Sequence, residues 1–165
     1  MESLFSPFMD DPAPLMSRFL SAQLIAARAL RRGRDGAPPA EEAATLSDMI
    51  AALEGDLGDA ASRLPDIALP RPLDTLAVGY IVLGSRLGTE VLARRLTALA
   101  LPLPLYFRLP PPGGAWTAFR ARLDALVPDQ PMAQRIATDA ALGFDIYAAS
   151  ARLAGLGAEG VTDGP

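Results

Sequence analysis

The chain of 165 residues contains no histidine, cysteine, lysine or asparagine. Without cysteine it forms no disulfide and offers no thiolate as a nucleophile or metal ligand. Without histidine it has no Ser-His triad, no imidazole base and no imidazole ligand for a metal. All fifteen basic residues are arginine, which together with abundant Ala, Leu, Gly and Pro is typical of a GC-rich genome. The absences therefore remove the commonest nucleophilic and metal-dependent mechanisms.

Positive charge and long apolar runs are also scarce. Fifteen basic residues face nineteen acidic ones, and the net charge of −4 argues against a dedicated nucleic-acid binder. The longest apolar stretch, residues 75–85, is shorter than the roughly 20 residues that span a bilayer. The first residues include an acidic side chain and show no apolar core of a secretory signal. We expect a soluble, cytoplasmic protein with no nucleic-acid or membrane partner.

The chain is instead rich in helical periodicity. Leu15, Phe19, Leu20 and Leu24 recur at helical spacing after an Asp-Asp-Pro start, and this helix is expected to end near residue 33. Further helices are expected over residues 40–64 (with a break near Gly55 or Gly58), 73–99, 115–127 and 130–157. No alternation of β-branched residues is long enough for a strand.

Prolines mark the connections between these helices. Residues 101–114, LPLPLYFRLPPPGG, are predicted to be non-helical because proline removes a backbone donor and favours extended backbone. The sequence thus predicts a single all-α domain over residues 1–156, a bundle of five or six helices with proline-rich connectors. Residues 157–165 are expected to form a flexible tail.

Two glycines four residues apart, Gly84 and Gly88, interrupt the helix expected over residues 73–99. Each costs about 1 kcal/mol relative to alanine inside a helix, and the spacing places both on one face. Two explanations fit. Another helix backbone packs closely there, which the spacing alone favours, or a flat and bulky molecule lies against that face.

The flanking residues resemble a known family. Residues 79–96, GYIVLGSRLGTEVLARRL, resemble the distal helix of bacterial biliverdin-producing heme oxygenases, where Tyr-Val-Leu-Glu-Gly-Ser-x-Leu-Gly-Gly precedes a Val-Leu-Ala-Arg-Arg-Leu-like run. RFLSAQLIAARAL (18–30), ALEGDLGDA (52–60), WTAFRARLDAL (116–126) and ATDAALGFDIY (137–147) resemble other helices of that family, so the resemblance covers residues 4–152. It implies a heme oxygenase-like helical fold, in which the glycines let backbone approach a porphyrin.

The same resemblance implies a set of residues beside a tetrapyrrole: Tyr80, Gly84, Ser85, Gly88 and Phe144. Tyr80 precedes Gly84 by one turn and can reach a buried ligand, Ser85 can order water, and Phe144 occupies the position of a ring that flanks the heme. Each has a structural alternative. Tyr80 and Phe144 suit an ordinary core, and a serine inside a helix more often bonds the carbonyl four residues earlier.

Departures from the family pattern affect catalysis. The family's axial histidine lies in a Thr-Arg-x-x-His-like stretch of its first helix, and this chain contains no histidine. When the motifs are aligned with those of the family, the first residue of this chain falls within or after that first helix. Leu83 stands where the family has Glu, and Thr89 replaces the second glycine, which narrows the distal space.

Other residues could contact a heme through sulfur or through positive charge. Met9 and Met16 carry sulfur that can ligate iron, but methionine more often fills gaps in a core. Arg18, Arg86 and Arg152 are candidate partners for propionates, although a surface position is the favoured interpretation of each. No residue is assigned as catalytic, and no metal site is identified.

The leading hypothesis is a degenerate heme oxygenase-like protein that binds heme or another tetrapyrrole weakly or not at all and does not cleave heme. One alternative is a genuine heme oxygenase, yielding biliverdin, CO and iron, whose assigned start omits the histidine helix. Another is an interaction or regulatory module. Because the first helix is largely missing, we also expect a second copy or a protein partner to cover the apolar groove it leaves.

Overall fold

The computed structural model describes residues 2–126 and 129–156, with side chains from residue 5 onward. Its helices are α1 (Glu2–Asp10), α2 (Pro12–Gly33), α3 (Ala40–Leu57), the 3-10 helix η1 (Gly58–Arg63), α4 (Thr75–Ala98), α5 (Leu105–Arg108), α6 (Gly113–Ala125) and α7 (Gln130–Leu153). The all-α class is confirmed, because no strand occurs in the described ranges. Seven α-helices exceed the five or six expected, and the predicted tail lies outside the described residues.

Helix α2 is buried along most of its length, and its sequence explains why. The apolar positions expected to face the core, from Leu15 through Phe19 and Leu20 to Leu24, are all buried. Several intervening positions are alanine and are also buried, which lets neighbouring helices approach. Helices α1, α3 and α7 pack against α2, and α4 packs against α7.

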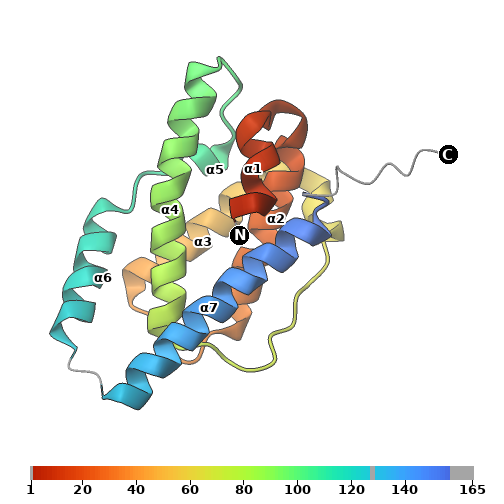
Figure 1. Ribbon diagram of the computed structural model, residues 1–165. Helices are drawn as coiled ribbons and strands as arrows, with labels where there is room; N and C mark the ends of the chain where they lie inside the picture. The colour runs from red at the N-terminus through yellow and green to blue at the C-terminus, as the bar shows by residue number, and fades with distance from the viewer. Residues whose placement is uncertain (1, 127–128, 157–165) are drawn as a thin grey trace.

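The arrangement leaves α4 with neighbours on several sides (Figure 1). Helix α7 crosses it, α6 lies along its outer side, and α3 and α5 also contact it. The apolar residues of these helices belong to one hydrophobic core that extends from Phe8 to Leu156. Two helices of that core, α4 and α7, supply all five residues expected at the binding site.

The break expected in the helix over residues 40–64 occurs at Gly58. Gly58 has φ +53°, a backbone conformation that costs other residues energy, and α3 ends immediately before it. Residues 58–63 then continue as the 3-10 helix η1. Of the two positions expected, Gly55 remains inside α3.

The prediction that residues 101–114 contain no helix is wrong for one turn. Leu105–Arg108 form α5 directly after Pro104. The carboxylate of Asp56, on α3, accepts hydrogen bonds from the backbone N–H groups of Leu105 and Tyr106 at 2.7 and 2.9 Å. A distant side chain therefore satisfies donors that a helix start leaves free.

Helix α1 was not among the helices expected from the sequence. It is held by aromatic packing, because the ring of Phe8 stacks on that of Phe19 in α2 with centroids 4.1 Å apart. Phe8 is 1% exposed, so the short helix is part of the core.

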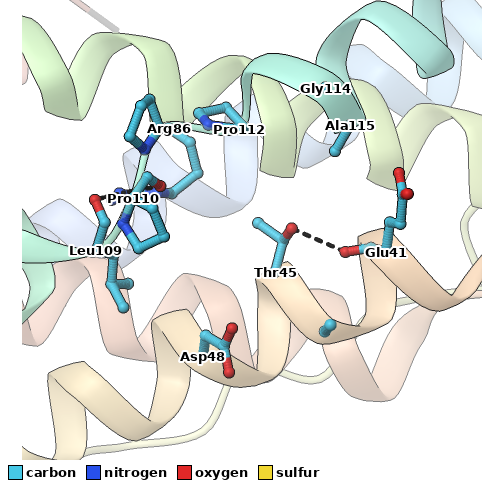
Figure 2. A pocket seen from close by; sticks show the side chains of 11 residues that line it. Glu41, Thr45, Asp48, Arg86, Leu109, Pro110, Pro112, Gly114 and Ala115 are labelled. Atoms are coloured by element: carbon cyan, nitrogen blue, oxygen red, sulfur yellow. Dashed lines mark hydrogen bonds between the residues drawn. The ribbon is translucent and has the colours of Figure 1, made fainter.

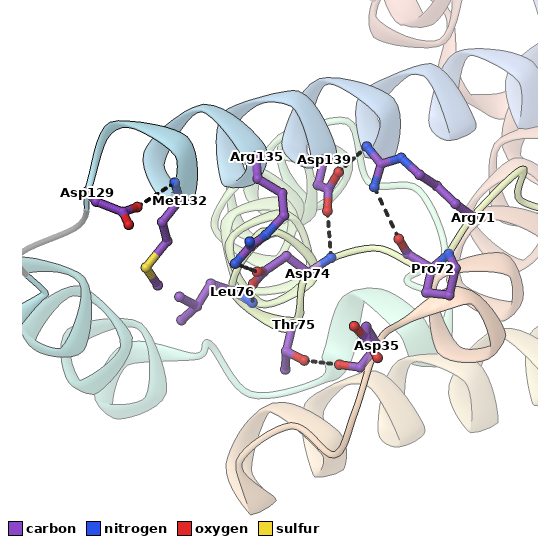
Figure 3. A network of polar contacts seen from close by, with 10 residues as sticks. All are labelled: Asp35, Arg71, Pro72, Asp74, Thr75, Leu76, Asp129, Met132, Arg135 and Asp139. Carbon is purple, nitrogen blue, oxygen red and sulfur yellow. Dashed lines mark hydrogen bonds and ion pairs between the residues drawn. The ribbon is translucent and has the colours of Figure 1, made fainter.

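The start of α4 is fastened to α7 by a polar network (Figure 3). Asp139 of α7 forms an ion pair with Arg71 and accepts a hydrogen bond from the backbone N–H of Asp74 at 2.7 Å. Asp74 in turn caps α4, since its carboxylate accepts from the N–H of Leu76 at 2.9 Å. The network fixes the relative position of the two helices that carry the predicted site residues.

Helix α4 is long and apolar enough to cross a membrane, judged by length and composition alone. Within the described parts of the chain it is the one helix with this property, and 44% of its most apolar window is buried inside the protein. Its packing against α3, α6 and α7 gives its apolar residues a structural role in the bundle.

Candidate functional site

A cavity of about 700 Å³ lies against α4 and is also lined by residues of four other helices. Its lining consists of Phe5, Phe8 and Met9 from α1, Phe19 and Gln23 from α2, Tyr80, Ile81, Gly84, Ser85, Leu87, Gly88, Thr89, Val91 and Leu92 from α4, Trp116 from α6, and Phe144 and Tyr147 from α7. Its size lies within the range of roughly 300 to 1,000 Å³ found for small-molecule sites. None of these seventeen residues carries a charge.

All five residues predicted from the resemblance line this one cavity: Tyr80, Gly84, Ser85 and Gly88 on α4, and Phe144 on α7. Phe144 is 64 residues from Tyr80 in the sequence, yet their ring centroids are 6.5 Å apart. The structure thus brings the predicted residues together. Their role in binding stays a prediction.

The two glycines that raised the question of a ligand face open space. A Cβ atom built on Gly84 or Gly88 meets no heavy atom within 4 Å. Gly79 on the same helix is different, since its Cβ would lie 2.6 Å from the carboxylate of Glu42 and 2.9 Å from the ring of Phe119. Close helix packing therefore explains Gly79, whereas it does not explain Gly84 and Gly88.

An aromatic cluster stands at the open side of the cavity. The ring of Tyr80 lies between Trp116 of α6, at a centroid distance of 6.0 Å, and Phe144 of α7. Tyr80 is 43% exposed and Phe144 36% exposed, so neither is the ordinary core residue that the structural alternative required. Exposed rings beside an apolar cavity can stack on a planar molecule at little cost in side-chain ordering.

Polar atoms of the lining are mostly engaged inside the protein. The Ser85 hydroxyl donates to the carbonyl of Val82 at 2.9 Å, a local bond as its structural alternative expected, but to the carbonyl three residues earlier and not four. Thr89 donates to the carbonyl of Ser85 at 2.9 Å and lies 3.3 Å from the Tyr106 hydroxyl. Thr89 lines the cavity and presents a hydroxyl already bonded to its own helix.

Two buried tyrosines flank this polar region. Burial raises the pKa of Tyr106, and the nearby Thr89 and Arg86 side chains offset part of that rise. Burial also raises the pKa of Tyr147, as does the proximity of Tyr106, and the nearby Ser85 side chain offsets part of that rise. The Tyr147 hydroxyl has no hydrogen-bond partner among the described residues. Both phenols therefore stay protonated at neutral pH.

None of the three arginines considered for propionates lines the cavity. Arg86 is 3% exposed and donates to the carbonyls of Tyr106, Leu109 and Pro110, at 3.2, 2.9 and 3.4 Å. It borders a separate cavity of about 300 Å³ beside the proline-rich connector (Figure 2). Its charge thus fastens that connector to α4, and the hypothesis of a propionate partner fails for it on position.

The lining fits the ring of a heme better than its iron. The open glycine face and the aromatic cluster suit a flat apolar macrocycle. Protein ligands to heme iron are usually His, Cys, Met or Tyr. Of the methionines considered, Met9 lines the cavity but is 36% exposed, and Met16 is not part of the lining. Two tyrosines also line the cavity: the Tyr147 hydroxyl is buried and stays protonated, and Tyr80 is 43% exposed beside Trp116 and Phe144.

The chain was compared with protein-family models, with curated proteins and with solved structures. None matches. The fold established for this chain is thus an all-α bundle, and the heme oxygenase resemblance rests on the motifs of α4 and its neighbours.

Sequence reasoning missed several residues of the cavity. Phe5 and Phe8 belong to a helix that was not expected, and Trp116 and Gln23 lie in helices that were expected but without a role at the site. Gln23 carries a signal that could have been used, because it is a polar residue in the middle of the apolar run of α2.

Proposed function

We propose that this chain is a divergent heme oxygenase-like protein that binds a planar, largely apolar molecule of the tetrapyrrole class and does not cleave heme. The observation that carries the proposal is the open space above Gly84 and Gly88 within the 700 Å³ cavity. Two glycines inside a helix cost about 2 kcal/mol together, and no protein contact offsets that cost here. A ligand that lies on that face would account for the two glycines.

Apolar burial supplies the driving force for such binding. Each 100 Å² of apolar ligand surface removed from water contributes about 2.5 kcal/mol. The rings of Tyr80, Trp116 and Phe144 add stacking surface. The uncharged lining provides no partner for a carboxylate, so carboxylate side chains of a tetrapyrrole must remain at the open side, in water.

A binding titration tests the proposal. Trp116 is the single tryptophan of the chain and lines the cavity, so its fluorescence reports occupancy by a tetrapyrrole that absorbs its emission. We expect saturable quenching by metal-free mesoporphyrin. Gly84→Leu should fill the open face and weaken binding at least tenfold.

Gly113→Leu is the matched control for that variant. A Cβ on Gly113 also meets nothing within 4 Å, but Gly113 does not line the cavity. Its affinity for mesoporphyrin should equal that of the unchanged chain. Equal binding by the chain and by both variants would show a nonspecific surface association and would contradict the proposal.

A second candidate function, docking of another protein chain, is favoured by exposure at the same place. Met9, Tyr80, Val91 and Phe144 are large apolar residues that line the cavity and remain at least 36% exposed. Such patches often mark interfaces. Light scattering at tens of micromolar distinguishes this candidate, since a ligand-free monomer argues against self-association through the cavity.

A further inference from the structure

Gln23 brings a side-chain amide to the wall of the cavity. It is 7% exposed, and its Oε1 accepts a hydrogen bond from the Tyr106 hydroxyl at 3.2 Å. That hydroxyl also lies 3.3 Å from Thr89 Oγ1. The hydrogen bond from Tyr106 places Oε1 at this end of the amide. Within the described part of the chain, the amide nitrogen Nε2 has no hydrogen-bond partner.

Apart from the Tyr106 and Thr89 hydroxyls, the neighbourhood of this amide is apolar. Phe19, one turn earlier on α2, lines the same cavity and stacks on Phe8 and Phe107. A ligand that fills the cavity displaces water from the amide nitrogen, so a molecule that supplies an acceptor gains over one of the same shape that does not. Sites of this kind discriminate strongly, because the wrong ligand leaves the protein group unpaired.

The missing acceptor should be uncharged. None of the residues that line the cavity carries a positive charge. A carboxylate placed beside Gln23 would lose its hydration without gaining a counter-ion. A ring carbonyl, such as a ketone, lactam or quinone oxygen, accepts a hydrogen bond without that cost.

We propose that Gln23 determines specificity by donating a hydrogen bond from Nε2 to a neutral carbonyl oxygen on the bound planar molecule. This inference rests on the proposed function, because it names which planar molecules the cavity prefers. It predicts selection of an oxygen-bearing macrocycle over the same macrocycle without the oxygen.

Two probes isolate that choice. Octaethylporphyrin and its oxochlorin carry the same eight ethyl groups; the oxochlorin adds one ring ketone, beside a carbon that bears two of those ethyl groups. Titrated into the unchanged chain and followed by Trp116 fluorescence, the oxochlorin should bind about tenfold more tightly. Gln23→Met keeps the volume and removes the donor, so the preference for the oxochlorin should disappear.

Two further variants complete the test. Gln134→Met makes the same change at an exposed position of α7 outside the cavity and should keep the tenfold preference. Gln23→Glu replaces the donor by an acceptor and should make the oxochlorin the weaker ligand. Thermal unfolding of each variant checks that the fold persists.

The failures are distinguishable. Equal binding of the two macrocycles by the unchanged chain overturns the role of Gln23 and leaves the proposed function standing; this measurement needs no variant. Binding of neither macrocycle overturns the proposed function, and the inference with it.

Discussion

At the scale of single residues, the glycines of α4 divide into two kinds. Gly79 makes room for Glu42 and Phe119, whereas Gly84 and Gly88 make room for no protein atom. Glycine therefore allows close packing at residue 79, and at residues 84 and 88 of the same helix it leaves a face that no protein atom covers. The difference predicts opposite effects of alanine on stability.

We expect Gly84→Ala and Gly88→Ala each to raise the free energy of unfolding by about 1 kcal/mol, because alanine favours the helix and meets no neighbour. Gly79→Ala should lower it, since a Cβ there must displace a buried ring, and overpacking costs about 1–3 kcal/mol. Urea unfolding measures all three. A loss of stability in Gly84→Ala would mean that the face is closed by protein.

The buried tyrosines form a second contrast. The Tyr147 hydroxyl has no partner among the described residues, while that of Tyr106 contacts Gln23 and Thr89. Tyr147→Phe should therefore raise stability by about 1 kcal/mol, and Tyr106→Phe should lower it by about as much.

The pH dependence provides a check on Tyr147. Because burial raises its pKa above the ordinary value of 10.0, the unfolded chain loses the phenol proton first. The contribution of Tyr147 to stability is thus complete below pH 10 and declines above it. Tyr147→Phe should flatten that decline. Equal alkaline loss in both proteins would place the cause elsewhere.

At the scale of elements, the helices were predictable where periodicity is local. The helix expected over residues 73–99 is observed as Thr75–Ala98, and its start is set by the Asp74 cap. Helix α5 was not predictable, because it depends on Asp56, which lies 49 residues before Leu105. Helix α1 depends on the stacking of Phe8 against α2, a contact that no local pattern shows.

The site was predictable to the same extent. The motif of α4 and the ring of Phe144 on α7 predicted five lining residues. A resemblance in sequence can do this because it shows which positions of a helix share one face. Gln23 and Trp116 were missed because their place beside α4 results from how α2 and α6 pack. The open space beside Gly84 and Gly88 could not be predicted from their spacing either, because spacing alone favoured close helix packing.

The network that joins α4 to α7 should make stability depend on acid. Burial by itself raises the pKa of Asp139, but the ion pair with Arg71, the N–H of Asp74 and the charge of Arg135 together hold it below 3.8. The stabilisation is complete above that value and is lost as pH falls below it.

Asp139→Asn should accordingly lower the free energy of unfolding at pH 7 by about 1–3 kcal/mol and remove part of the acid dependence. Asp145→Asn on the exposed side of the same helix is the control and should change little. Thermal unfolding between pH 3 and pH 7 measures both. An unchanged acid dependence in Asp139→Asn would contradict the role of the network.

At the scale of the whole molecule, the shape of the cavity and the chemistry of its lining lead to different expectations. The bundle shapes a largely apolar cavity, and its lining offers iron only the Met9 thioether and the phenols of Tyr80 and Tyr147, of which that of Tyr147 is buried and protonated. Hemin mixed with the protein and ascorbate should therefore yield no biliverdin or CO beyond that from hemin alone. Catalytic biliverdin formation, with one sharp Soret band, would show that the cavity holds iron productively.

The position of the ligand is the central claim, and proton NMR tests it most directly. A porphyrin ring current shifts protons above its face strongly upfield. On addition of metal-free mesoporphyrin, we predict upfield shifts of the α-protons of Gly84 and Gly88, while those of Gly79, Gly113 and Gly114 stay in place. Saturated binding with unchanged Gly84 and Gly88 signals would contradict the account.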